Sequence, residues 1–223
     1  MMVGILLAAG ASTRMGSPKA LRAAGRESYL VRGVRRLWTA CDSVVVVLGS
    51  RGPVIRRRAE LEFERLVAAG KLHQDLVRSG RTRAHGLEAQ FVQNREWSKG
   101  MLSSVREGLK AARDLDPEGV FVLPVDHPDV KPATIASLAV LLRGALASSR
   151  TRKERAAFAY ALVPRHGRRR GHPIAMSPAL AWAVLADREA RDLSDGVRRN
   201  ARLVGYVDVA DAGIGRNVNT PND

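Results

Sequence analysis

Short runs of apolar, often β-branched residues recur along the chain, and segments of mixed polarity separate them. Continuous apolar runs of this length are typical of strands that are buried on both faces of a parallel sheet. The order of strand, helix and strand favours right-handed crossovers between parallel strands, and so an α/β fold with a mostly parallel sheet. The predicted strands are residues 3–7, 43–48, 88–93, 119–124, 157–163 and 201–209.

Between these runs, apolar residues return every three or four positions, as they do on the buried face of a helix. Helices are predicted at 27–40, from near Gly100 to 112, at 132–146 and at 194–200. The segment 51–86 is highly charged and helical in composition, which indicates one or two amphipathic helices with a basic outer face. It is either a solvated insertion or a docking surface. The length of 223 residues fits one domain, 1–223, with this insertion.

The net charge of +15 is concentrated in residues 51–83 and 143–170. Aromatic residues, at 4%, do not interleave with the basic runs, so nucleic-acid binding is not expected as the main function. A basic surface that attracts anionic nucleotides, or an acidic protein partner, explains the charge better. The single cysteine, Cys41, excludes an internal disulfide. Without a charged leader or an apolar stretch of roughly 18 residues, a cytoplasmic location and no membrane partner are expected.

A glycine-containing loop follows the first predicted strand, with the sequence LAAGASTRMGSPKAL over residues 7–21. Gly10 and Gly16 allow tight turns and close approach of a ligand to the backbone. Free N–H groups in such a loop bind phosphate oxygens. Arg14 and Lys19 add a flat guanidinium and a compact ammonium, which suit two different contacts on one polyphosphate.

This loop resembles the signature of nucleotidyltransferases similar to the molybdenum cofactor cytidylyl- and guanylyltransferases. The resemblance implies a three-layer α/β/α sandwich with a Rossmann-like sheet, and catalytic roles for Arg14, Lys19 and Asp126. Two further segments extend it, NREWSKGMLSS from Asn94 and GHP from Gly171. The implied nucleotide-binding residues are Leu7, Ala8, Ala9, Gly10, Ser12, Asn94, Gly100 and Ser103, and the implied acceptor side holds Gly171 and His172.

Asp126 follows the predicted strand 119–124, and ligands of parallel sheets lie at the carboxyl ends of the strands. A carboxylate there is suited to Mg²⁺, which prefers one or two carboxylates with phosphate oxygens and water. His127 either meets the nucleotide or shapes the turn. The ending NTPND resembles the family's ending NTPED, and implies Asn219 as a second, weaker metal ligand.

Together these features predict a Mg²⁺-dependent nucleotidyltransferase that moves an NMP group from an NTP to a small phosphorylated acceptor, molybdopterin among them. Ala9, where the guanylyl branch has glycine, favours CTP, because its methyl group crowds a purine more than a pyrimidine. Three alternatives remain: a GTP-specific transferase, a transferase specific for sugar phosphates, and an inactive nucleotide-binding assembly factor for a molybdenum enzyme.

Overall fold

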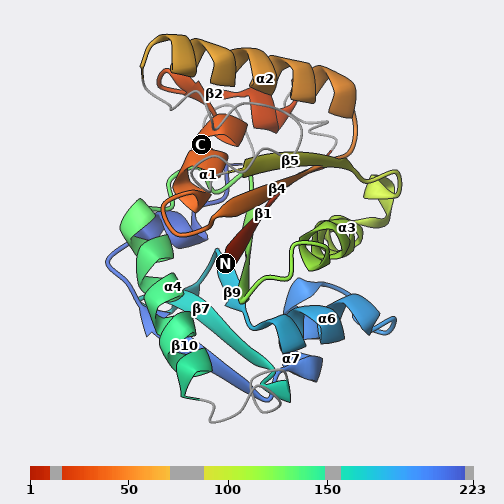
Figure 1. The fold of residues 1–223 in the computed structure, drawn as a ribbon, viewed down its shortest axis with the longest axis vertical. Helices are drawn as coiled ribbons and strands as arrows, with labels where there is room; N and C mark the ends of the chain where they lie inside the picture. The colour runs from red at the N-terminus through yellow and green to blue at the C-terminus, as the bar shows by residue number, and fades with distance from the viewer. Residues whose placement is uncertain (11–16, 71–87, 149–156, 219–223) are drawn as a thin grey trace.

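The computed structural model describes residues 1–10, 17–70, 88–148 and 157–218. Its main sheet has the order β10-β7-β9-β6-β1-β4-β5, and β8 pairs with β7 (Figure 1). Neighbouring strands are parallel, except that β9 is antiparallel to β6 and β7, and β8 to β7. The predicted mostly parallel sheet is therefore confirmed. Its strands are β1 (Met2–Ala8), β4 (Ser43–Leu48), β5 (Glu88–Gln93), β6 (Gly119–Pro124), β7 (Tyr160–His166), β8 (Arg169–Arg170), β9 (Ile174–Met176) and β10 (Leu203–Asp208).

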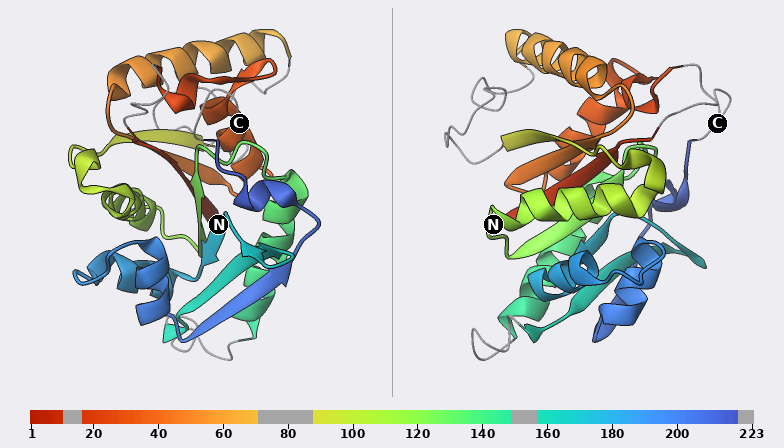
Figure 2. Two further views of the ribbon diagram at one scale, coloured as in Figure 1. Left: turned by 180° about the vertical axis from the view of Figure 1, so that it is seen from behind. Right: turned by 90° about the vertical axis from the view of Figure 1, so that its right-hand side faces the viewer.

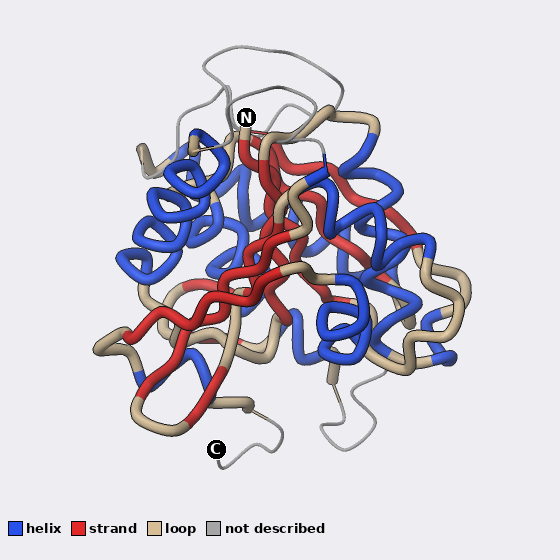
Figure 3. The backbone as a smooth tube through the Cα atoms, turned by 90° about the horizontal axis from the view of Figure 1, so that it is seen from below, coloured by secondary structure: helices blue, strands red, loops and turns tan. Residues whose placement is uncertain are grey.

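Helices cover both faces of this sheet, which gives the predicted three layers (Figures 2 and 3). One face carries α1 (Tyr29–Leu37), α2 (Gly52–Ala68) and α4 (Pro132–Ala147). The other carries α3 (Met101–Arg113), α6 (Pro178–Ala186) and α7 (Leu193–Asn200). None of the described helices is both long and apolar enough to cross a bilayer.

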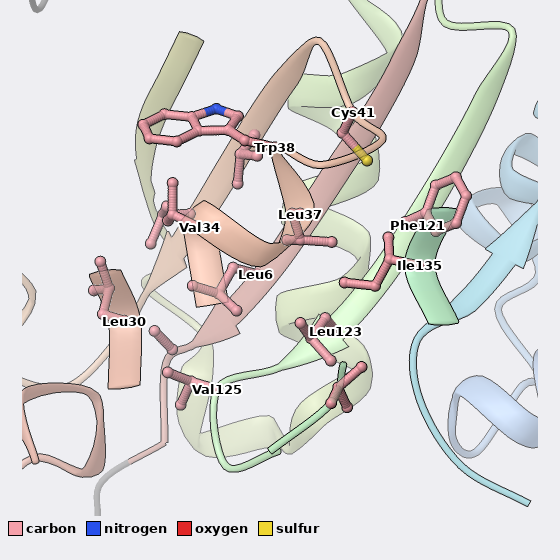
Figure 4. Close-up of a cluster of buried hydrophobic side chains, with 14 of the residues drawn as sticks. Leu6, Leu30, Val34, Leu37, Trp38, Cys41, Phe121, Leu123, Val125 and Ile135 are labelled. Atoms are coloured by element: carbon pink, nitrogen blue, oxygen red, sulfur yellow. The ribbon is translucent and has the colours of Figure 1, made fainter. Parts of the chain in front are cut away.

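The central strands separate two apolar cores, because successive side chains of a strand point to opposite faces. Leu6 packs with the α1 and α4 side, whereas Ile5 packs with the α3 side. In the first core, Leu37 of α1, Phe121 and Leu123 of β6 and Ile135 of α4 gather around Leu6 (Figure 4). Strands buried on both faces hold their carboxyl ends in fixed positions, which matters for the site below.

A helix cap and a hairpin explain why two elements have other bounds than the sequence predicts. The first helix begins at Tyr29, not at 27, because the Ser28 hydroxyl accepts a hydrogen bond from the Val31 N–H. Glu27–Ser28 instead forms β3, which pairs with β2 (Ala23–Ala24). The strand expected at 157–163 runs from Tyr160 to His166, because it continues into a hairpin with β8. Within the basic segment 51–86, α2 is helical as predicted, and 71–87 lie outside the described residues.

Candidate functional site

A cleft of about 550 Å³ opens at the carboxyl ends of β1, β4 and β6. Parallel α/β sheets bind their ligands at this edge. The structure brings most of the predicted site residues together here, from segments that are far apart in the sequence. The lining includes Leu7, Ala8, Ala9, Gly10, Lys19, Gly100, Asp126, His127 and His172.

Lys19 and Asp126 face each other across this cleft. Lys19 begins the short 3-10 helix η2 (Lys19–Leu21), and Asp126 follows β6. The Lys19 Nζ lies 3.5 Å from the Asp126 Oδ2, and both side chains are about one-fifth exposed, at 18% and 21%. The Val125 N–H donates to the Leu7 carbonyl at 2.9 Å, which ties the Asp126 turn to the end of β1. The cleft therefore holds one cation and one carboxylate at the same point.

Among the described residues that line the cleft, three buried polar atoms have no hydrogen-bond partner: the Oδ1 of Asp126 and the Nδ1 atoms of His127 and His172. The His127 Nε2 lies 3.9 Å from the Asp126 Oδ1. The Asp126 Oδ1 accepts no hydrogen bond from the described residues. A buried carboxylate oxygen without a donor is costly, so such an atom is suited to a cation. Within the described ranges no group of three His, Cys, Asp or Glu side chains forms a metal centre. Asp126 thus fits a metal that takes most of its ligands from phosphate and water.

The end of the chain passes beside this carboxylate. The Val218 N–H donates to the Asp126 carbonyl at 2.9 Å, and Asn217 lines the cleft. Asn219, the predicted second metal ligand, lies outside the described residues, as do Ser12 and Arg14 of the loop.

The opposite wall is formed by the segment that leads into α3. Trp97, Ser98 and Gly100 line the cleft, together with Met101 and Ser104 at the start of α3. Gly100 has a φ of 99°, a backbone conformation that favours glycine. The segment therefore turns sharply into the helix at the edge of the cleft.

Asn94 and Ser103 are not among the residues that line the cleft. Asn94 is only 1% exposed, and its Nδ2 donates to the Ser103 Oγ at 2.9 Å and to the Ser104 Oγ at 3.0 Å. Its Oδ1 accepts from the Glu96 N–H at 2.8 Å. All of these bonds lie behind the wall, so Asn94 positions the Trp97–Ser104 segment from within, and Ser104 is the serine at the cleft.

The acceptor-side element meets the cleft through His172. A Cβ atom on Gly171 would lie 2.0 Å from the Ile214 carbonyl oxygen, so only glycine fits there. The His172 N–H donates to the same carbonyl at 3.0 Å. The imidazoles of His127 and His172 lie 5.0 Å apart between centroids, at 58°. Burial lowers the pKa of His127, and it lowers the pKa of His172 to about 4.

This burial predicts a loss of stability in mild acid. Because the pKa of His172 falls from 6.5 in the unfolded chain to about 4 in the fold, the unfolded chain binds more protons between these values. The neutral imidazole of His172 makes its full contribution to the stability of the fold above pH 6.5, and this contribution is lost as the pH falls towards 4. The free energy of unfolding is measured in urea at pH 7 and at pH 5. Between the two, it should fall by about 2 kcal/mol more in the wild type than in the His172→Asn variant. Equal losses would contradict the buried neutral imidazole.

Ile55, Met101 and Asn217 are among the cleft residues that the sequence did not single out. Ile55 lies in the first turns of α2, Met101 begins α3 and Asn217 precedes the tail. Ile55 and Met101 are apolar residues at helical spacing, which indicates packing rather than a ligand site. Asn217 lies two residues before the family-like ending that begins at Asn219, and that proximity was the available signal.

Comparison with known proteins agrees with this geometry. A curated relative, nicotine blue oxidoreductase of Paenarthrobacter nicotinovorans, is 32% identical over 98% of this chain and 92% of its own length. The crystal structure of Rv0371c from Mycobacterium tuberculosis superposes with a TM-score of 0.67 at 21% identity, over 99% of this chain and 94% of that one. Rv0371c was also solved in complex with manganese (TM-score 0.59, 19% identity, 93% and 88% covered).

A nucleotidyl transferase from Methanothermobacter, Mth528, has the same fold, with a TM-score of 0.65 at 17% identity over 100% of this chain and 94% of that one. These structural likenesses concern the fold. The family model that describes MobA-like NTP transferase domains matches residues 4–203, which include most of β1, the Lys19 turn, Asp126 and the His172 element. The chain therefore belongs to the family of MobA-like NTP transferase domains, and is by family an enzyme of the nucleotidyltransferase class.

Proposed function

We propose that the chain transfers a nucleotidyl group from an NTP, with CTP preferred, to a small phosphorylated acceptor such as molybdopterin, and releases pyrophosphate. The observation that carries this proposal is the pairing of Lys19 with Asp126, 3.5 Å apart at the carboxyl ends of the parallel strands. A cation for phosphate and a carboxylate with an unsatisfied oxygen are the two groups that this transfer requires.

The donor set suits Mg²⁺. Asp126 would hold the ion through its orphaned Oδ1, and Asn219 would add a neutral carbonyl oxygen. When bound, Mg²⁺ supplies positive charge to the α-phosphate and to the departing pyrophosphate. The manganese complex of Rv0371c supports a divalent cation in this fold.

The protein's own groups would position the reactants. The ammonium of Lys19, which faces Asp126 in the structure, would turn to the triphosphate, and Arg14 of the loop would join it. An acceptor phosphate oxygen would attack the α-phosphorus in line, forming one P–O bond as the bond to the pyrophosphate breaks. Such an oxygen is already anionic at neutral pH, so no general base is needed. The acceptor would enter beside Gly171 and His172.

The base would lie between Ala8 and Ala9 on one side and Trp97 and Ser104 on the other. Gly49, which follows β4, packs against Ala9 and Trp97. A Cβ atom there would lie 2.2 Å from the Ala9 carbonyl oxygen and 2.7 Å from the Trp97 Cβ. With the backbone this tightly packed, the Ala9 methyl group cannot withdraw. We therefore expect CTP to be preferred over GTP by about tenfold or more.

A substitution at Asn94 tests whether this residue positions the wall of the cleft or contacts the nucleotide directly. The free energy of unfolding of the Asn94→Ala variant should be about 2 kcal/mol lower, because the change removes the hydrogen bonds to the buried Ser104 hydroxyl and to the Glu96 N–H. The Ser103 hydroxyl keeps its bonds to the Glu96 and Gly100 carbonyls. The Asn94→Ala variant should also bind nucleotide more weakly. The Ser104→Ala variant should bind nucleotide more weakly as well, but with little loss of stability. An Asn94→Ala protein of unchanged stability but lost affinity would instead make Asn94 a direct ligand.

The curated relative favours a second candidate, because its name is that of an oxidoreductase. The diphosphate of a nicotinamide dinucleotide would also offer Lys19 anionic phosphate oxygens, although it carries fewer negative charges than the triphosphate of an NTP. One fold hosts more than one chemistry, so a redox reaction on a small organic substrate in the same cleft is the alternative.

The deciding experiment incubates the protein with each NTP, Mg²⁺ and molybdopterin or a panel of sugar phosphates, and measures pyrophosphate release. Acceptor-dependent release with CTP is the expected result. NADH or NADPH oxidation without pyrophosphate release would favour the oxidoreductase. Nucleotide binding without either reaction would favour an inactive assembly factor for a molybdenum enzyme, for which the basic surface would be the docking face of an acidic partner.

A further inference from the structure

A second cavity, of about 410 Å³, lies between the β2–β3 ribbon and α2. Figures 1 and 2 show α2 running alongside this ribbon. Three arginines line the cavity: Arg26 from the ribbon, and Arg58 and Arg65 from α2. The two arginines of α2 are seven positions apart, which places them on one face of the helix. Three exposed arginines therefore lie around one cavity.

These arginines have no partners among the described residues. Neither an ion pair nor a hydrogen bond joins the side chain of Arg26, Arg58 or Arg65 to any of them. The two carboxylates that line the cavity are already engaged. Glu27 pairs with Arg35, and the Glu62 Oε1 accepts from the Ser28 N–H at 2.6 Å. Glu62 keeps its negative charge, because a backbone N–H is neutral, so the cavity has three guanidinium charges against one carboxylate that no ion pair cancels.

We propose that this cavity is a second anion site, which binds a small phosphorylated molecule. A phosphate carries about two negative charges and several acceptor oxygens, and it matches the forked donors of more than one guanidinium. A single carboxylate, being flat, is satisfied by one arginine. The side chains of Leu21 and Leu66 also line the cavity and give the carbon part of such a ligand an apolar wall.

The second cavity is distinct from the nucleotide cleft. In η2, Lys19 lines the cleft whereas Leu21 lines the second cavity. In α2, Ile55 lines the cleft whereas Arg58 lines the second cavity. No residue lines both. The inference therefore does not depend on the nucleotidyl-transfer proposal, and the two fail separately.

The test is a calorimetric titration with inorganic phosphate, at constant ionic strength set with chloride. It is performed in Lys19→Ala protein, so that phosphate binding in the cleft is weakened. We expect the Arg58→Gln and Arg65→Gln variants each to weaken binding by about tenfold or more. Arg57→Gln is the matched control, because Arg57 is an exposed neighbour on α2 that does not line the cavity.

Equal loss with Arg57→Gln would show that only the general charge of α2 matters, and would overturn the site. Binding that Arg58→Gln leaves unchanged, or no binding at millimolar phosphate, would overturn it as well. Each substitution is on the exposed face of a helix, so the variants are expected to fold, and circular dichroism confirms this before titration.

Discussion

Lys19→Ala protein will retain its fold and lose nucleotidyl transfer by about 10²- to 10³-fold. The ammonium of Lys19 lies at the cleft, 3.5 Å from the Asp126 carboxylate, where the charge of a transferred phosphate develops. Removing one fixed donor from such a position typically costs this much in rate. The partly exposed ion pair itself contributes at most about 1 kcal/mol to the stability of the fold. Pyrophosphate release at saturating NTP and Mg²⁺ measures the rate, and thermal unfolding measures the stability.

Lys110→Ala is the control for this change. Lys110 pairs with Glu107 on the exposed surface of α3, at 2.6 Å, and lies away from the cleft. Its variant removes the same charge from the chain and should keep the wild-type rate. A Lys19→Ala enzyme with an unchanged rate would remove Lys19 from the transfer step, whatever its effect on binding.

Asp126→Ala protein will fold and lose metal-dependent turnover by about 10²-fold or more, with Asp126→Asn between it and the wild type. The alanine variant removes the orphaned Oδ1, whereas asparagine keeps one neutral oxygen, which is a weaker ligand for a hard cation. Because the Asp126 carbonyl, not its side chain, accepts from the Val218 N–H, this hydrogen bond should remain in the variant. The measurement is the rate as a function of Mg²⁺ concentration.

Asp129→Asn gives the matched comparison, since Asp129 pairs with Arg216 at 3.2 Å outside the cleft. It should show the wild-type dependence on Mg²⁺. If Asp126→Ala kept full turnover with the same Mg²⁺ dependence, the metal would have to be held elsewhere and the proposed site would be wrong.

Much of the sheet was predictable, because fully buried parallel strands leave a strong pattern. The predicted bounds of β4, β5 and β6 are those of the structure. By contrast, α6 and the antiparallel β9 were not predicted. Almost every residue of α6 is apolar, so the helix has no polar face to reveal its period. The Ser177 cap and Pro178 in its first turn were the available signals.

The site was predictable only in part, because sequence motifs identify residues but not which of their atoms face a ligand. The loop resemblance and the position of Asp126 after a buried strand brought Lys19 and Asp126 into the same hypothesis, and the structure places them 3.5 Å apart. The motif containing Asn94 could not reveal that its side chain points into the protein. That information lies in the hydrogen bonds to Ser103 and Ser104, which only the folded backbone creates.

The most direct measurement is thermal unfolding of the wild type and Lys19→Ala with CTP, GTP, ATP, UTP and dTTP, each with and without Mg²⁺. A ligand that binds only the folded state raises the melting temperature, and at one concentration a tighter ligand raises it more. The structure predicts a rise with CTP that Mg²⁺ strengthens and that the Lys19→Ala variant loses. No rise with any nucleotide, or a rise that Lys19→Ala leaves unchanged, would contradict a nucleotide held between Lys19 and Asp126.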